Sequence, residues 1–116
     1  MKIIENSLEG IKEAAKILTS NGIVAFPTET VYGLGANAFS KKAVTKLYEI
    51  KRRPSFNPLI IHVSSYEMAK EYGIFNYTAE KLVKKYWPGP LTIIVKKKKS
   101  KVVEAATAKL ETIALR

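Results

Sequence analysis

Apolar residues recur with helical spacing in three stretches of the chain. They are Ile11, Ala14, Ala15 and Leu18; Ala43, Val44, Leu47 and Ile50; and Ala79, Leu82, Val83 and Tyr86. Residues three and four positions apart share one face of a helix, so each set predicts an amphipathic helix. Asn6, Ser40 and Thr78 are the expected N-caps, because a short polar side chain can accept a hydrogen bond from the free N–H groups of the first turn.

Short apolar runs between these helices are typical of buried strands. They cover residues 2–5, 23–26, 59–63, 91–95 and 111–116. The Thr- and Gly-rich segment 27–35 is expected to be a loop, and 102–110 fits neither pattern. Ser64 followed by Glu67 predicts one more short helix over 66–72. Because strands and helices alternate, we expect a mixed α/β domain with helices packed on a sheet, whose strand order the sequence leaves open.

Composition narrows the class of protein. A chain of 116 residues with 47% hydrophobic residues is expected to form one globular domain. It has no cysteine and one histidine, which excludes disulfides and argues against a transition-metal site. No apolar run reaches the length of a membrane span and the first residues do not resemble an export signal, so we expect a cytoplasmic protein without membrane contact.

The net charge of +10 favours anionic partners such as nucleotides or RNA. Lysine supplies most of it, which weakens the case for sequence-specific nucleic-acid recognition, where arginine is preferred. The run 96–101 is the densest cluster, and such runs are usually mobile, solvated loops. It could instead bind phosphate backbones non-specifically.

Residues 27–63 hold the candidate binding chemistry. Lys51 and Arg53 lie where a helix gives way to a loop, and two cations suit a triphosphate, although cations also favour helix C-termini for structural reasons. Gly33 and Gly35 do not continue into a phosphate-binding loop. His62 lies in an apolar strand and is expected to face away from Ile61. It is either a structural residue or a site residue.

Several ordered motifs resemble one family. They are Pro27-Thr28-Glu29-Thr30-Val31-Tyr32-Gly33-Leu34; Lys51-x-Arg53-Pro54 with Asn57-Pro58-Leu59; His62-Val63; Trp87-Pro88-Gly89-Pro90-Leu91-Thr92; and Thr112-Ile113-Ala114-Leu115-Arg116. Together they closely resemble the YrdC family, the L-threonylcarbamoyladenylate synthases of tRNA modification. The resemblance spans nearly the whole chain.

The resemblance implies an α/β fold with a twisted, open mixed sheet and a basic concave face. It also implies a nucleotidyltransferase that joins L-threonine, bicarbonate and ATP into threonylcarbamoyl-AMP and pyrophosphate, for the N6-threonylcarbamoyl modification of adenosine 37 in tRNA. Mg²⁺ is expected on the phosphates. Double-stranded RNA and other proteins of the tRNA-modification machinery are the further partners that the resemblance implies.

The resemblance also assigns roles to individual residues. Thr30, His62 and Arg116 are similar to the residues that contact L-threonine, with Arg116 holding its carboxylate. The residues similar to the ATP contacts are Lys51, Arg53, Asn57 and Thr112, and the first two are the catalytic candidates.

The family's Ser-x-Asn segment, commonly Ser-Ala-Asn-x-Ser-Gly, completes the nucleotide site opposite the Lys-x-Arg pair, and these 116 residues do not contain it. Ser55-Phe56-Asn57 has the same spacing but belongs to the basic loop, and Lys109 replaces a frequent glycine. We therefore expect residues 1–116 to be a C-terminally truncated YrdC-like domain with little or no synthase activity of its own. Two alternatives remain open: a non-catalytic RNA- or nucleotide-binding module that uses the basic face, and a remnant without a selected role.

Overall fold

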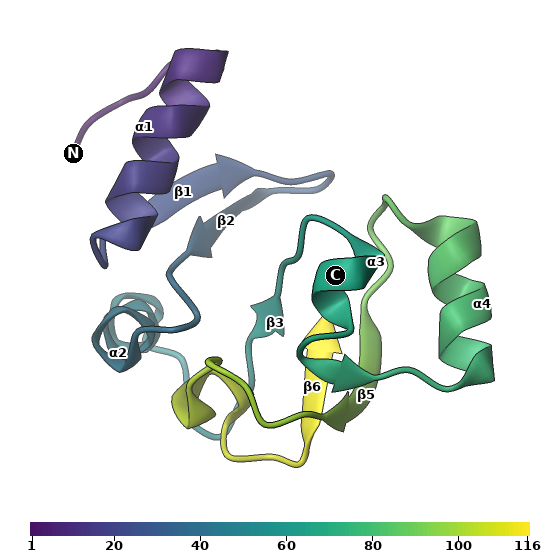
Figure 1. Cartoon of the computed structure of the whole chain (residues 1–116). Coiled ribbons are helices and arrows are strands. Elements are labelled where there is room, and N and C mark those ends of the chain that lie inside the picture. Colours follow the sequence, from purple (N-terminus) through teal and green to yellow (C-terminus); the bar gives the residue numbers. More distant parts are fainter.

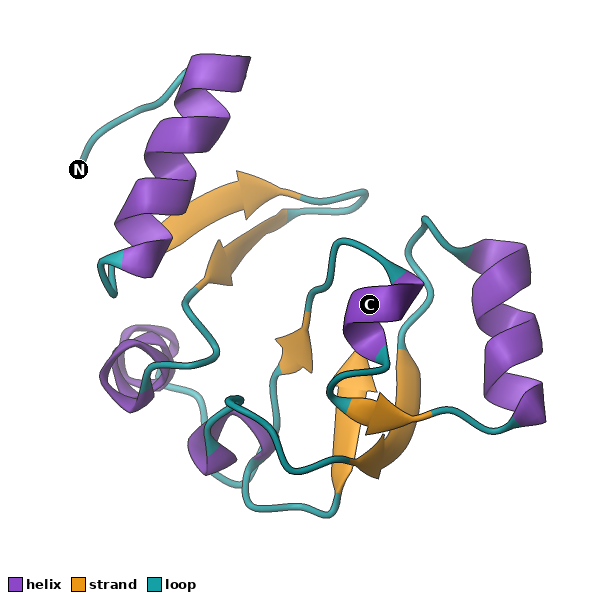
Figure 2. Ribbon diagram, in the orientation of Figure 1, coloured by secondary structure: helices purple, strands orange, loops and turns teal.

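The computed structural model describes all residues, Met1–Arg116, and confirms a mixed α/β architecture (Figures 1 and 2). The helices are α1 (Leu8–Thr19), α2 (Lys41–Lys51), α3 (Tyr66–Ala69), α4 (Tyr77–Tyr86) and the 3₁₀ helix η1 (Glu104–Thr107). The strands are β1 (Val24–Pro27), β2 (Tyr32–Gly35), β3 (Ile60–Ile61), β4 (Gly73–Ile74), β5 (Ile93–Lys97) and β6 (Thr112–Leu115). No helix is both long enough and apolar enough to cross a bilayer.

The strands form two separate sheets. β1 and β2 make an antiparallel hairpin, whereas β3, β6, β5 and β4 form a four-stranded sheet in that order. Within it β3 runs parallel to β6 and the other pairs are antiparallel, so the sheet is mixed. Figure 1 shows α1 and the hairpin on one side of the molecule, and α3 and α4 beside the larger sheet.

One face of the larger sheet carries the core. Ile113 and Leu115 of β6 are 1% and 0% exposed, and their cross-strand partners Val95 and Ile93 are also buried. Helix α2 adds Val44, and further core residues come from α3, α4 and η1. The opposite face is largely uncovered. Ile94 belongs to β5, an inner strand of this sheet, and yet its side chain is 70% exposed.

Most helix N-caps lie near the predicted positions but not at them. Ser40 caps α2 as predicted, accepting from Ala43 N at 3.1 Å. The other three predicted caps were wrong: the caps are Ser7, not Asn6; Ser65, not Ser64; and Asn76, not Thr78. Neighbouring short polar residues have similar capping ability, so the packing of the helix decides which one is used. The third helix is also shorter than predicted, ending at Ala69.

The apolar helix faces are narrower than the spacing predicts. Ile11 and Ile50 are 60% and 52% exposed, while Tyr48 is buried instead. Leu82 and Tyr86 are also exposed, at 38% and 49%. Helical periodicity identifies a face, but the number of residues it buries depends on what packs against it.

Several predicted strands need correction. Residues 2–5 form no strand, and Gly10 of α1 lies so close to this segment that an added Cβ would be 2.0 Å from Glu5 O. The end of the predicted loop 27–35 is strand β2, while β4 was not predicted at all. β1 and β3 are only partly buried, because the hairpin and the edge strand each have one open side.

The basic run begins inside a strand instead of forming a solvated loop throughout. Lys96 and Lys97 belong to β5, and Lys97 Nζ contacts Glu104 Oε2 at 3.1 Å and Thr107 Oγ1 at 3.0 Å. Lys98 Nζ donates to the Lys70 carbonyl at 2.7 Å. Two of the cations therefore have protein partners.

We predict that the substitution Ile113→Ala lowers the free energy of unfolding by about 2–5 kcal/mol, because it leaves a cavity at the centre of the core. Urea unfolding followed by circular dichroism measures the change. Ile94→Ala on the neighbouring strand is the matched control: its side chain is exposed, and it should change stability by less than about 0.5 kcal/mol. Equal losses in the two variants would contradict the assignment of the buried face.

Candidate functional site

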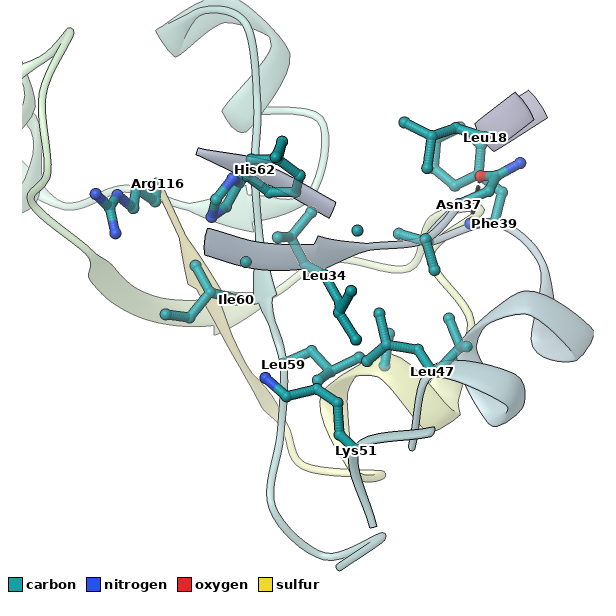
Figure 3. Close-up of a pocket in the computed structure, with 18 of the residues that line it drawn as sticks. Leu18, Leu34, Asn37, Phe39, Leu47, Lys51, Leu59, Ile60, His62 and Arg116 are labelled. Carbon is teal, nitrogen blue, oxygen red and sulfur yellow. Dashed lines mark hydrogen bonds between the residues drawn. The ribbon is translucent and has the colours of Figure 1, made fainter. Parts of the chain in front are cut away.

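A cavity of about 500 Å³ lies at the β3 edge of the larger sheet, between that strand, the hairpin and α2 (Figure 3). Most of its lining is apolar, contributed by Leu18, Phe26, Leu34, Phe39, Leu47, Leu59 and Ile60 among others. Four side chains that can carry positive charge also line it: Lys51, Arg53, His62 and Arg116. An apolar cavity with a few polar groups is the usual form of a small-molecule site.

The parallel pairing of β3 with β6 brings His62 and Arg116 together. Ile61 pairs with Leu115, and the ladder continues through Arg116 N to Ile61 O at 3.0 Å and Val63 N to Arg116 O at 2.9 Å. The His62 side chain reaches solvent although Phe26 covers part of its ring, whereas Ile61 is buried, which confirms the predicted alternation. His62 and Arg116 also line a second cavity of about 460 Å³ and therefore lie between the two.

The C-terminal end of helix α2 and the loop after it supply the other two cations. It ends at Lys51, and Arg52 adopts a left-handed conformation that turns the chain toward Arg53. The Arg53 guanidinium donates to the carbonyls of Asn57 at 3.1 Å and Pro58 at 2.7 Å. Arg53 thus shapes the loop that follows the helix and also lines the cavity. Lys51, by contrast, has no ion-pair partner. Figure 3 shows Lys51 and Arg116 in different parts of the cavity wall.

Glu29, at the tip of the hairpin, forms an ion pair with Arg116. Their side chains are 44% and 22% exposed, respectively. A hydrogen bond from the backbone, together with the Arg116 guanidinium, holds the pKa of Glu29 below its usual value. Glu29 is therefore an anion at neutral pH, held against a cation that lines the cavity.

His62 lies next to this ion pair. Partial burial lowers its pKa, the Arg116 charge lowers it further, and the Glu29 charge acts in the opposite direction. The ring also makes an edge contact with Phe26, with the ring centroids 5.8 Å apart. At neutral pH the imidazole is therefore uncharged, so it can both donate and accept a hydrogen bond.

Three residues predicted for the site do not line the cavity. Thr30 is exposed in the hairpin tip, where its Oγ1 lies 3.4 Å from that of Thr28, which does line the cavity. Asn57 is exposed, and its backbone carbonyl accepts bonds from Tyr48 and Arg53. Thr112 is exposed at the far end of β6, roughly 13 Å along the strand from Arg116. Their roles stay predictions.

Sequence reasoning missed the ion pair and most of the apolar lining. Glu29 lies between two threonines in a polar turn, and no local pattern indicates that it meets a residue 87 positions away. Phe26 was expected only as a strand residue. Its place before a polar turn was the one available signal, because side chains at strand ends often face a ligand site.

The residues around the cavity do not form a metal site. None of its lining residues is acidic, and no three acidic or histidine side chains cluster anywhere in the chain. Mg²⁺ prefers carboxylate and phosphate oxygens. The lining therefore does not fit a Mg²⁺ ion held by protein ligands.

We predict that the single histidine titrates below its ordinary pKa and that its two charged neighbours shift the value in opposite directions. Arg116→Gln should raise the pKa of His62 because it removes a nearby positive charge, and Glu29→Gln should lower it because it removes a negative one. Imidazole proton shifts in an NMR pH titration measure both changes. Shifts of the same sign in the two variants would contradict the geometry.

Comparisons with known proteins place the chain in a family. The family model Sua5/YciO/YrdC, described as "Telomere recombination", matches residues 16–116. A threonylcarbamoyl-AMP synthase of Bacillus subtilis is 49% identical over 107 residues, covering 91% of this chain and 31% of its own length. One of Pyrococcus abyssi is 48% identical over 126 residues, covering 100% of this chain and 36% of its own.

A crystal structure of P. abyssi Sua5 complexed with L-threonine superposes with a TM-score of 0.88 at 44% identity. The match covers 99% of this chain and 33% of that one. The chain thus spans about a third of the length of these relatives. Because the family model matches most of the residues and the fold agrees, the chain belongs to the Sua5/YciO/YrdC family.

Proposed function

We propose that this chain forms the L-threonine site and part of the ATP site of a threonylcarbamoyl-AMP synthase. The observation that carries the proposal is the convergence of Lys51, Arg53, His62 and Arg116 on one largely apolar cavity. The names of the relatives and the L-threonine in the P. abyssi structure support this choice of substrate.

In this proposal the amino acid binds at the Arg116 end of the cavity. A guanidinium pairs with a carboxylate through charge-assisted hydrogen bonds, which are stronger than neutral ones. The uncharged His62 can hydrogen-bond the threonine hydroxyl, and the apolar wall around Phe26 suits the methyl group. Thr30 stays a predicted contact at the hairpin tip.

ATP would be held near the Lys51 and Arg53 end, with Asn57 and Thr112 as the further predicted contacts. The threonine amine first combines with bicarbonate to give a carbamate and water. A carbamate oxygen then attacks the α-phosphorus of ATP, and pyrophosphate leaves as the bond to the α-phosphorus breaks. Because both reactants are anions, positively charged side chains contribute by positioning them and by stabilising the developing charge.

Several finer predictions accompany the proposal. They are a role in tRNA threonylcarbamoylation, contact with tRNA or double-stranded RNA, contact with other proteins of that machinery, and a cytoplasmic location. The alternative of a non-catalytic RNA-binding module is not favoured. Lys97 and Lys98 of the basic run already have protein partners, Glu104 and the Lys70 carbonyl.

We predict that Arg116→Gln weakens L-threonine binding about 10- to 100-fold, because the substrate carboxylate loses a charge-assisted bond. Isothermal titration calorimetry measures the dissociation constant. Arg52→Gln is the matched control, since it removes the same group from an exposed position outside the cavity lining. A wild-type chain that does not bind L-threonine, or equal effects in the two variants, would contradict the proposal.

We also predict that the 116-residue chain, assayed alone, does not release pyrophosphate from ATP in the presence of L-threonine and bicarbonate. The reason is that the family's Ser-x-Asn segment is not among these residues. A coupled pyrophosphate assay measures the release. Robust release that is abolished by Lys51→Ala or Arg53→Ala would show that the prediction is wrong and that this chain holds a full catalytic site.

A further inference from the structure

We propose that Glu29 is a specificity determinant of the amino-acid site: its carboxylate binds the α-ammonium group of the substrate, beside Arg116, which binds the α-carboxylate. The proposal deepens the proposed function and rests on it. The ligand class that follows is a free α-amino acid in its zwitterionic form, as opposed to a carboxylic acid without an amine.

The position of Glu29 is built by two elements that are far apart in sequence. Glu29 comes from the tip of the β1–β2 hairpin and Arg116 from the end of β6, and their ion pair bridges the two sheets. The tip is held in shape by Thr28, whose Oγ1 bonds Val31 O and accepts from Thr30 N at 3.3 Å. Glu29 is therefore presented toward Arg116 by an ordered turn.

The charges at this point match a zwitterion. An α-amino acid carries an ammonium and a carboxylate group on the same carbon, so its binding site needs an anion and a cation side by side. Lys51 and Arg53 have no carboxylate partner, and none of the residues lining the cavity is acidic. Glu29 does not line the cavity itself, but it is paired with Arg116, which does, so it is the one carboxylate held by an ion pair against a cation of this cavity.

The pair also has capacity to bind a ligand. Arg116 donates one side-chain bond, from Nη2 to Glu29, and the other N–H groups of its guanidinium meet no protein acceptor. A guanidinium can bind two carboxylates at once because it has five donors in a fixed plane. Glu29 also stays ionised, since its pKa is lowered, and so retains the charge needed to attract an ammonium group.

This contact concerns binding and not proton removal. A carboxylate whose pKa is lowered is a weak base, so Glu29 does not accept the proton that the ammonium must lose before a carbamate can form. Its expected contribution is affinity and orientation of the incoming amino acid.

A different role for Glu29 makes the opposite prediction. If Glu29 only held Arg116 in the empty site, it would compete with the substrate carboxylate. Its removal would then strengthen the binding of every carboxylate ligand. The two roles are therefore distinguished by the sign of one measurement.

The experiment measures dissociation constants by calorimetry for L-threonine, 3-hydroxybutanoate, which lacks the ammonium, and L-threoninamide, which lacks the carboxylate. Glu29→Gln should weaken L-threonine about 10-fold or more, because a charge-assisted bond is lost. It should not weaken 3-hydroxybutanoate, so the preference of the wild-type chain for L-threonine over this acid disappears. Binding of L-threoninamide should weaken as well.

Glu13→Gln is the matched control. Glu13 is 41% exposed and paired with Lys2, and neither residue lines either of the two cavities described above. The substitution changes the net charge by the same amount and should leave all three ligands unaffected. Because Glu29 is exposed, its variant should fold, and the His62 resonances report directly on the integrity of the neighbouring site.

Three results would overturn the proposal: an unchanged affinity for L-threonine in Glu29→Gln, equal weakening of L-threonine and 3-hydroxybutanoate, or tighter binding of both. If in these cases the wild-type chain still binds L-threonine and Arg116→Gln does not, the proposed function stands and the role of Glu29 fails alone. If the wild-type chain binds no L-threonine, both fail together.

Discussion

The parallel pairing of β3 with β6 is the constraint on which the site depends. These strands come from distant parts of the chain, and the register of Ile61 with Leu115 decides where the following residues lie. Leu115 is fully buried, so a slip by one residue would move it to the open face and expose the core. The packing of Leu115 thereby fixes the position of the next residue, Arg116, beside His62 and Glu29.

The cavity gathers positive charge in mostly apolar surroundings, which is electrostatically unfavourable without a ligand. The structure offsets this positive charge in different ways at the two ends of the cavity. Arg53 is satisfied by backbone carbonyls, Arg116 is paired with Glu29, and His62 is kept neutral by burial and by the Arg116 charge. Lys51 alone has no ion-pair partner, so an anionic ligand would be the first negative charge to contact it. This uneven distribution fits two ligands of different charge: a zwitterion at one end and a polyanion at the other.

The sequence predicted the local features of this fold better than the long-range ones. Ser40, the helical spacing of Ala43, Val44 and Leu47, and the final strand were predicted correctly, because each depends on neighbours within a few residues. Strand β2 was missed because Gly33 and Gly35 lack the β-branched side chains that indicate a strand. Motif resemblance singled out Arg116 and His62, which both line the cavity. The meeting of Glu29 with Arg116 depends on how two sheets approach each other, which no local pattern encodes.

The hairpin and the larger sheet share no backbone ladder, so the cavity between them is bounded by side chains. The contact of Phe26 with His62 and the ion pair of Glu29 with Arg116 both cross this boundary, one apolar and one charged. The apolar contact is insensitive to the charge of a ligand, but the ion pair is not, because a substrate carboxylate and ammonium can bind to its two members. A ligand of the right charge pattern can therefore bind to the charged contact between the sheets, with its carboxylate on Arg116 and its ammonium on Glu29. This explains physically why an amino-acid site would lie at this boundary and not on the rigid, apolar face of the sheet.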